Sequence, residues 1–191
     1  MNTTPSTAYW AEKERGFVDA LGKLHPGDKA RLRRHAGKTL SESVDVLGVF
    51  YRLLPHGVPD RQHDRFFLVA TLFPLADAGK QGNFGTTLSH MRTSSNAAGL
   101  DRRIAALLDA DERQLPFRLR QLVRLAHANR VGVNWPQLLS DLRRWGWEDR
   151  PVQRAWAMAY FAKSGADAGA NGEASEATAD EPAEPLEADE R

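Results

Sequence analysis

The sequence contains no cysteine, so disulfide bonds and thiolate zinc sites are excluded. It has no apolar run of the roughly 20 residues that a membrane-spanning helix needs. The segment 1–17 lacks the long apolar core of a signal peptide. No strand-like alternation of apolar and polar residues persists, and no internal repeat is evident. These absences favour an all-α protein, which we expect to be cytoplasmic.

Signatures of catalysis are also missing. The six histidines never occur at the HExxH or HxxxH spacing that holds a metal ion. His63 and Asp64 are adjacent, but neighbours on a helix point in different directions. The glycine-rich segment 82–85 lacks the Lys-Ser/Thr pair of a P-loop, and no strand precedes it. We therefore expect no enzymatic activity, no catalytic residues, no metal and no cofactor.

What the sequence does have is apolar residues at helical spacing. This periodicity predicts a compact all-α bundle of about seven to nine helices within residues 1–163. Pro74 should end or kink the most apolar helix near Phe73. The expected helices cover 7–24, 28–37, 40–54, 60–73, a short stretch around Thr86–Met91, 100–108, 115–128, 134–145 and 151–163.

Several local patterns make these expectations specific. Thr39 and Glu42 have the spacing of a capping box, which predicts a helix start at Leu40. Gly132 is expected to adopt the left-handed conformation in the turn 129–132, and Asn134 to cap the next helix. The apolar stripe of the helix after the capping box is expected to be Leu40, Val44, Leu47, Tyr51 and Leu54.

Most aromatic residues fall on faces that are expected to be buried. That prediction covers Trp10, Phe17, Tyr51, Phe66, Phe73, Trp145 and Trp156. Three aromatics remain candidates for stacking on bases, namely Phe84, Trp135 and Trp147. Because stacking platforms are few, the sequence favours contact with a nucleic-acid backbone over readout of bases.

Charge is distributed unevenly along the chain. Residues 1–163 hold 25 of the 26 Lys+Arg but only 16 of the 25 Asp+Glu, a net formal charge of +9. Residues 164–191 carry nine acidic residues and one arginine, a net of −8, and they have no aromatic residue. A basic body attracts polyanions. A segment so poor in apolar residues cannot bury enough surface to order itself, so we expect 164–191 to be a disordered acidic tail.

Arginine clusters recur on several of the expected helices, with few carboxylates at i±4 in 29–38 and 116–130. Such clusters are often simple solvated faces. Their repetition and the fit of the planar guanidinium to phosphate oxygens favour phosphate contact instead.

Six segments in order carry a resemblance to a known family. They are FYRLLP (50–55), FFLVATLF (66–73), GNFGTTL (82–88), LDRRIAALLDAD (100–111), LPFRLRQLVRLAH (115–127) and VNWPQLLSDLRRW (133–145). Together they resemble CasB, the small subunit of the type I-E CRISPR surveillance complex, Cascade. The resemblance covers about residues 8–163 and leaves out the acidic tail.

The resemblance implies a non-catalytic all-α subunit for antiviral defence. Two copies would associate head to tail along the belly of a guide-RNA complex, beside the guide-binding backbone subunits and below the large subunit. They would stabilise the R-loop by holding the displaced non-target DNA strand and supporting the target strand. Base pairing with the guide RNA would supply sequence specificity.

Eleven cations are candidates for contact with nucleic acid. The resemblance indicates Arg33, Arg34, Arg52, Arg103 and Arg120. Helical phase adds Arg124, Arg143 and Arg144, and local charge density adds Lys29, Arg31 and Lys38.

Two other functions remain open at this point. A free-standing DNA-binding regulator would use the helix pair 116–145 and would prefer a specific duplex sequence. A metal-dependent hydrolase using scattered His and Asp residues would contain bound metal, which elemental analysis of the purified protein would detect. The tail also has two interpretations, a solubilising extension or a competitor of nucleic acid for the basic faces. Deletion of 164–191 would separate them, because only a competitor's removal strengthens binding to random single-stranded DNA.

Overall fold

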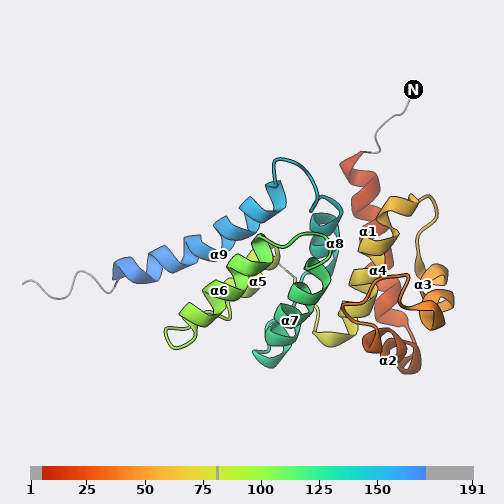
Figure 1. Ribbon diagram of the computed structural model, residues 1–191, viewed down its shortest axis with the longest axis horizontal. Coiled ribbons are helices and arrows are strands. Elements are labelled where there is room, and N and C mark those ends of the chain that lie inside the picture. Colours follow the sequence, from red (N-terminus) through yellow and green to blue (C-terminus); the bar gives the residue numbers. More distant parts are fainter. Residues whose placement is uncertain (1–5, 81, 171–191) are drawn as a thin grey trace, which may run out of the picture.

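The computed structural model of the protein describes residues 6–80 and 82–170, with side-chain environments described up to Ala162. Within these residues the chain forms nine α-helices and three short 3-10 helices, joined by turns (Figure 1). The backbone pairing outside the helices is a single parallel bridge between Ala78 and Val133. The all-α prediction is therefore confirmed.

In chain order the elements are α1 (Thr7–Lys23), α2 (Pro26–Arg34), η1 (Val44–Val46), α3 (Leu47–Leu53), η2 (Asp60–Gln62), α4 (His63–Leu72), η3 (Phe73–Leu75), α5 (Phe84–Ser89), α6 (Ala97–Leu108), α7 (Leu115–Ala128), α8 (Trp135–Arg143) and α9 (Pro151–Ala170).

Helix α4 occupies the centre of one half of the molecule. It packs against α2, α7 and α8, and every residue from Phe66 to Leu72 is buried. In Figure 1, α1 to α4 lie on one side, α5, α6 and α9 on the other, with α7 and α8 between them. As predicted, α4 ends at Leu72, just before Pro74, because proline removes a backbone donor and its ring clashes with the preceding turn.

The turn between α7 and α8 differs from the prediction in one residue. Arg130, with φ of 57°, adopts the left-handed conformation expected of Gly132. Glycine is required at 132 for a different reason. A Cβ atom there would lie 2.8 Å from the carbonyl oxygen of Ala78, because the two segments run side by side. The predicted cap of α8 is confirmed, since the side chain of Asn134 accepts a hydrogen bond from the backbone N–H of Gln137.

The predicted helix start at Leu40 is wrong. Glu42 does accept hydrogen bonds from the backbone N–H and the hydroxyl of Thr39, both at 2.8 Å. This box closes a turn, however, and helical structure begins only at Val44. The later start changes which side chains face inward. Val46, Val49 and Phe50 are buried. Val44 is 72% exposed and Tyr51 48% exposed, so neither belongs to the core stripe that was predicted for them.

The other aromatic residues named in the sequence analysis divide between core and surface. Phe17, Phe66, Trp145 and Trp156 are buried as predicted, and Trp10 and Phe73 are partly buried against the core. Of the three stacking candidates, Phe84 and Trp135 are also buried, so they cannot stack on bases. Trp147 is 58% exposed and remains a candidate.

Helix α9 continues to Ala170, beyond the end expected at Lys163. The predicted tail therefore begins with helical residues. The disorder predicted for the rest of it, 171–191, lies outside the described residues. A tail deletion should accordingly begin at Asn171, which leaves the described part of α9 intact.

The contact between α5 and α9 depends on Gly85. A Cβ atom at this position would overlap the backbone carbonyl of Trp156. We expect Gly85→Ala to lower the free energy of unfolding by roughly 1–3 kcal/mol, because the helices must separate to admit the methyl group.

The matched control is Gly16→Ala. Gly16 is exposed in the middle of α1, and a Cβ atom there would meet nothing within 4 Å. Alanine is the better helix former, so this variant should gain up to about 1 kcal/mol. Urea denaturation of both variants measures the difference, and equal effects of the two substitutions would contradict the packing argument.

Candidate nucleic-acid interface

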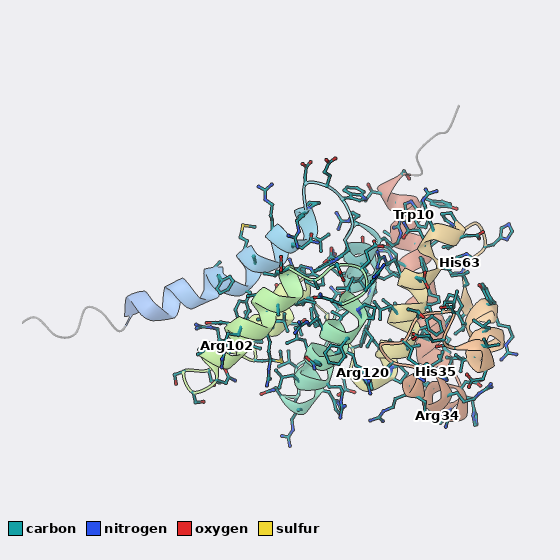
Figure 2. All side chains as sticks on the ribbon, viewed as in Figure 1. Trp10, Arg34, His35, His63, Arg102 and Arg120 are labelled. Carbon is teal, nitrogen blue, oxygen red and sulfur yellow. The ribbon has the colours of Figure 1, made fainter. Side chains whose placement is uncertain are left out.

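The end of α2 and the beginning of α7 meet at Gly37. This residue has φ of +79°, and a Cβ atom there would lie 3.0 Å from Cδ of Arg120 and 3.4 Å from the carbonyl oxygen of Pro116. The close approach places Arg120 beside the segment that carries Arg33, Arg34 and Lys38, all three of them exposed. Figure 2 shows the labelled Arg34 and Arg120 in the same lower region of the molecule.

A buried histidine fixes the turn that follows α2. Nδ1 of His35 lies 3.0 Å from Oγ of Ser43, and Nε2 lies 3.1 Å from a carboxylate oxygen of Asp45. Oγ of Ser43 donates to the carbonyl oxygen of Thr39. Although these three residue types also form nucleophilic triads, Ser43 is fully buried and cannot reach a substrate. The network instead orients the turn, and with it the exposed arginines at the end of α2.

A groove between α6 and α7 extends the same basic region. It has a volume of about 460 Å³, and Arg103 from α6 and Arg124 from α7 line it together with Gln121, Leu125 and Ala128. Arg120 and Arg124 are one helical turn apart on α7, so they lie on the same side of that helix. Arg120 thus connects the end of α2 with the groove.

We call these six side chains the basic face: Arg33, Arg34, Lys38, Arg103, Arg120 and Arg124. None of them takes part in the ion pairs formed among residues 6–80 and 82–162. Cations without a carboxylate partner can bind phosphate oxygens without breaking an internal ion pair. The structure therefore brings together six of the eleven predicted cations.

Two further candidates on α2 have partners inside the protein. Nζ of Lys29 donates to the carbonyl oxygen of Gly22 at 2.6 Å. Arg31 donates to the carbonyl oxygen of Asp45 at 2.5 Å and lies 3.6 Å from the carboxylate of Asp28. These contacts fasten the start of α2 to its neighbours. Arg52 is exposed on α3, outside the basic face as defined.

Arg143 lies in the interior between α8 and α1. Its guanidinium is 2.5 Å from the carboxylate of Glu14 and 3.4 Å from the ring centre of Trp10, and the side chain is only 12% exposed. Burial raises the pKa of Glu14, although the hydrogen bond from Arg143 lowers it, and burial lowers the pKa of Arg143. Helical phase alone made Arg143 a candidate for nucleic-acid contact, whereas the structure engages it in a buried ion pair.

Arg144 also has a carboxylate partner, Asp141 three residues earlier at 2.9 Å, although its own side chain is 39% exposed. The buried carboxylate of Asp141 also accepts hydrogen bonds from Nε1 of Trp156 at 2.7 Å and from Gln137 at 2.9 Å. Burial raises the pKa of Asp141, with these hydrogen bonds and Arg144 opposing the shift. Arg143 therefore joins α8 to α1, whereas Arg144 pairs with a carboxylate of its own helix. Because both already have a carboxylate partner, we leave them out of the basic face.

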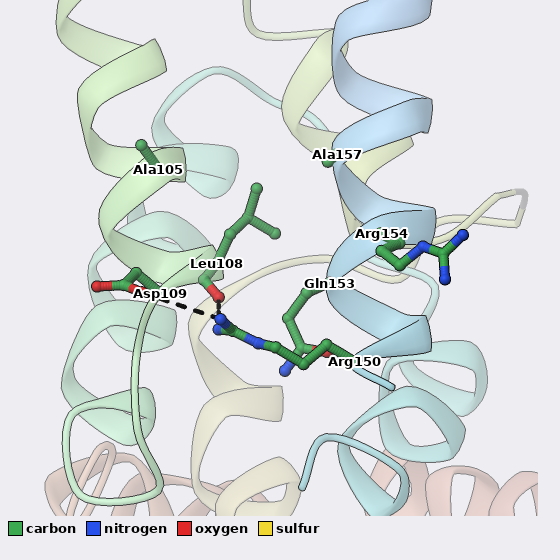
Figure 3. Close-up of a pocket in the computed structure, with 7 residues that line it drawn as sticks. All are labelled: Ala105, Leu108, Asp109, Arg150, Gln153, Arg154 and Ala157. Atoms are coloured by element: carbon green, nitrogen blue, oxygen red, sulfur yellow. Dashed lines mark hydrogen bonds and ion pairs between the residues drawn. The ribbon is translucent and has the colours of Figure 1, made fainter. Parts of the chain in front are cut away.

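Arg150 also has its partners inside the folded protein. It closes the end of α6 by donating to the carbonyl oxygen of Leu108, and it lies 3.9 Å from Asp109 (Figure 3). Arg102, outside the predicted set, is exposed on α6 and donates to the carbonyl oxygen of Ala98 in its own helix. Local charge density was the sequence signal that could have added it.

Other kinds of site find no support in the described part of the chain. It contains no group of three or more His, Asp or Glu residues that could hold a metal ion. Nor does any helix there have the length and apolar character needed to cross a membrane.

Arginines in buried ion pairs and arginines of the basic face should respond differently to substitution by an uncharged residue. We expect Arg143→Met to lower the free energy of unfolding by about 3–5 kcal/mol, because it leaves the Glu14 carboxylate buried without its partner. Arg124→Met removes an exposed charge and should change stability by no more than about 0.5 kcal/mol. Urea denaturation measures both. A loss of stability in Arg124→Met as large as that in Arg143→Met would contradict the division.

Comparison with known proteins identifies the family. Residues 28–161 match the family described as CRISPR-associated protein Cse2. A Cse2 protein of Thermus thermophilus is 35% identical over 155 residues, which cover 76% of this chain and 88% of that protein. The crystal structure of M. ruber CasB, 29% identical, has a TM-score of 0.71 and covers 83% of this chain and 97% of its own. A chain of a CRISPR RNA-guided surveillance complex, 21% identical, shares the fold with a TM-score of 0.72 over 85% of this chain and 99% of its own. As the sequence resemblance predicted, the chain belongs to the CRISPR-associated Cse2 family, also called CasB.

Proposed function

We propose that this protein is the non-catalytic small subunit of a type I-E CRISPR surveillance complex and that its basic face stabilises the R-loop. Its partners would be the guide-binding backbone subunits, the large subunit, the guide RNA and both DNA strands. Family membership supports this role, and so does the shared fold with a chain from a CRISPR RNA-guided surveillance complex.

The observation that carries the proposal is the basic face itself. Six cations come from neighbouring segments, namely α2, the turn after it, α6 and α7, and have no ion-pair partner among residues 6–80 and 82–162. Such a surface suits the phosphates of a displaced or pairing strand. No base readout is needed there, because base pairing with the guide supplies sequence specificity.

Exposed apolar side chains supply candidates for the subunit contacts. In the N-terminal half, Val44 and Tyr51 line a groove of about 420 Å³. On α9, Met158 is 71% exposed and Phe161 44% exposed, and their spacing places them on one face of the helix. α3 and α9 lie on opposite sides of the molecule (Figure 1). Two different patches on opposite sides suit the head-to-tail association of two copies that we propose.

The alternative of a free-standing regulator loses support in the structure. A recognition helix must enter the major groove of a duplex. Helix α8, which would take that role, buries Trp135, Leu138, Leu139 and Leu142 against the rest of the protein. Its Arg143 is buried as well. Little of α8 is left to contact base edges.

The proposal is tested by the lifetime of the R-loop on a matched target. Complexes are assembled with this chain, without it, or with Arg33, Arg34, Arg120 and Arg124 all changed to Glu. We expect the charge-reversed chain to assemble and the R-loop lifetime to fall roughly tenfold or more, because repelled phosphates replace bound ones. The difference should shrink as the salt concentration rises, since salt screens these contacts.

A matched control reverses four exposed cations elsewhere. Arg15, Lys23, Arg61 and Arg113 are exposed, lie outside the basic face and make no ion pair among the described side chains. Their change to Glu alters the net charge by the same amount and should leave the lifetime near that of the unaltered chain. If the chain with the four charge reversals in the basic face restores the full R-loop lifetime, this face is only solvated surface.

A further inference from the structure

The protein carries two strongly charged parts of opposite sign. Residues 171–191 follow directly on α9 and hold eight carboxylates and one arginine, a net formal charge of −7. The carboxylates are Glu173, Glu176, Asp180, Glu181, Glu184, Glu187, Asp189 and Glu190. The basic face presents six cations that have no ion-pair partner in the described part of the chain.

We propose that the acidic segment 171–191 binds the basic face of its own chain and competes there with the nucleic-acid backbone. The inference rests on the proposed function, because it concerns the same surface. It adds a regulatory contact within the protein, in which carboxylates occupy the positions that phosphates take in the complex.

Charge complementarity selects the basic face over other surfaces. Many arginines elsewhere already face carboxylates of the folded body, namely Arg31, Arg65, Arg92, Arg143, Arg144 and Arg150. Adding a second carboxylate to such a pair gains little, because the first has neutralised the charge. The six cations of the basic face come from neighbouring segments, so their potentials add and a chain with many carboxylates can bind several at once.

The length of the segment favours this contact. Fully extended, residues 171–191 span up to about 75 Å at 3.3–3.6 Å per residue. Helix α9, to which the segment is joined, packs against α6, and α6 contributes Arg103 to the basic face. A covalent tether of this length gives an effective concentration in the millimolar range, so individually weak ion pairs suffice.

The contact has a defined consequence for binding. Nucleic acid must displace the carboxylates before it reaches the cations, which weakens its binding to the protein alone. Nucleic acid that displaces the segment also releases fewer small ions than nucleic acid that binds an open basic face. Its affinity for the protein therefore depends less steeply on the salt concentration. Within a guided complex, the strands of the R-loop are held beside the surface at high local concentration and can displace the segment. The segment would thereby suppress non-specific binding and spare binding within the complex.

The experiment compares three forms of the protein with the same unstructured oligonucleotide, a deoxythymidine homopolymer. The forms are the full chain, a chain ending at Ala170, and a full-length chain whose eight tail carboxylates are changed to Asn or Gln. We expect both altered forms to bind about tenfold or more tightly at low salt, with a steeper salt dependence. Affinities should converge at high salt. The neutral tail separates the effect of charge from that of length, and equal affinity and slope in the three forms would overturn the proposal.

A second measurement tests where the segment binds. A labelled peptide of residues 171–191 is added to the chain that ends at Ala170. We expect binding that salt weakens, that the oligonucleotide displaces, and that Arg33→Glu, Arg34→Glu, Arg120→Glu and Arg124→Glu together abolish. Peptide that still binds the four-residue variant equally well would show that the segment contacts another surface, and the proposal would fail.

The two proposals fail in different ways. If the peptide does not bind the basic face but reversal of that face still shortens the R-loop lifetime, only the inference about the tail fails. If reversal of the basic face leaves the R-loop lifetime unchanged while the peptide still binds that face, the proposed function fails and the intramolecular contact stands.

Discussion

The ion pair between Glu14 and Arg143 joins the first helix of the protein to the eighth across 129 residues of sequence. Trp10 covers the guanidinium, so both charges lie away from water. Burial costs these groups hydration, as the raised pKa of Glu14 and the lowered pKa of Arg143 indicate. A buried pair of this kind adds little net stability, but loss of either partner leaves the other charge uncompensated. The position of α8 between α1 and α9 therefore depends on both residues being present.

A second buried carboxylate extends the same arrangement toward the C-terminal half. Asp141 accepts hydrogen bonds from Trp156 on α9 and from Gln137 and Arg144 on α8. Arg143 thus bonds to Glu14 of α1, and Asp141 bonds to Trp156 of α9, so polar contacts of α8 reach both neighbouring helices. Arg143 and Arg144 therefore already have carboxylate partners, and the cations that we assign to the basic face come from α2, the turn after it, α6 and α7.

The arginines thus fall into two groups, those with a carboxylate partner in the folded protein and those without one. Their positions on the predicted helices did not distinguish these groups. Those that meet carboxylates distant in sequence hold the fold together, and those of the basic face meet none among residues 6–80 and 82–162. The acidic residues missing from that face occur instead in 171–191. A protein that binds polyanions without reading their sequence has no contact that rejects the wrong ones. The competition that we propose for the acidic segment on the same chain would supply such discrimination.

The features that the sequence alone determined are those with local causes. Helical periodicity, the stop at Pro74 and the cap at Asn134 each depend on residues a few positions apart, so they could be read along the chain and were confirmed. The ordered segments that resemble CasB likewise identified the family. The predicted start of the helix after Thr39 was wrong although Glu42 does accept the hydrogen bond from the backbone N–H of Thr39. Packing of Val46, Val49 and Phe50 against the core sets the phase of that helix instead. Only the tertiary structure decided which arginines are available for phosphate, since the partners of Arg143 and Arg150 lie far away in sequence. Charge pairing across a folded core is a non-local property, so neither composition nor helical phase can predict it.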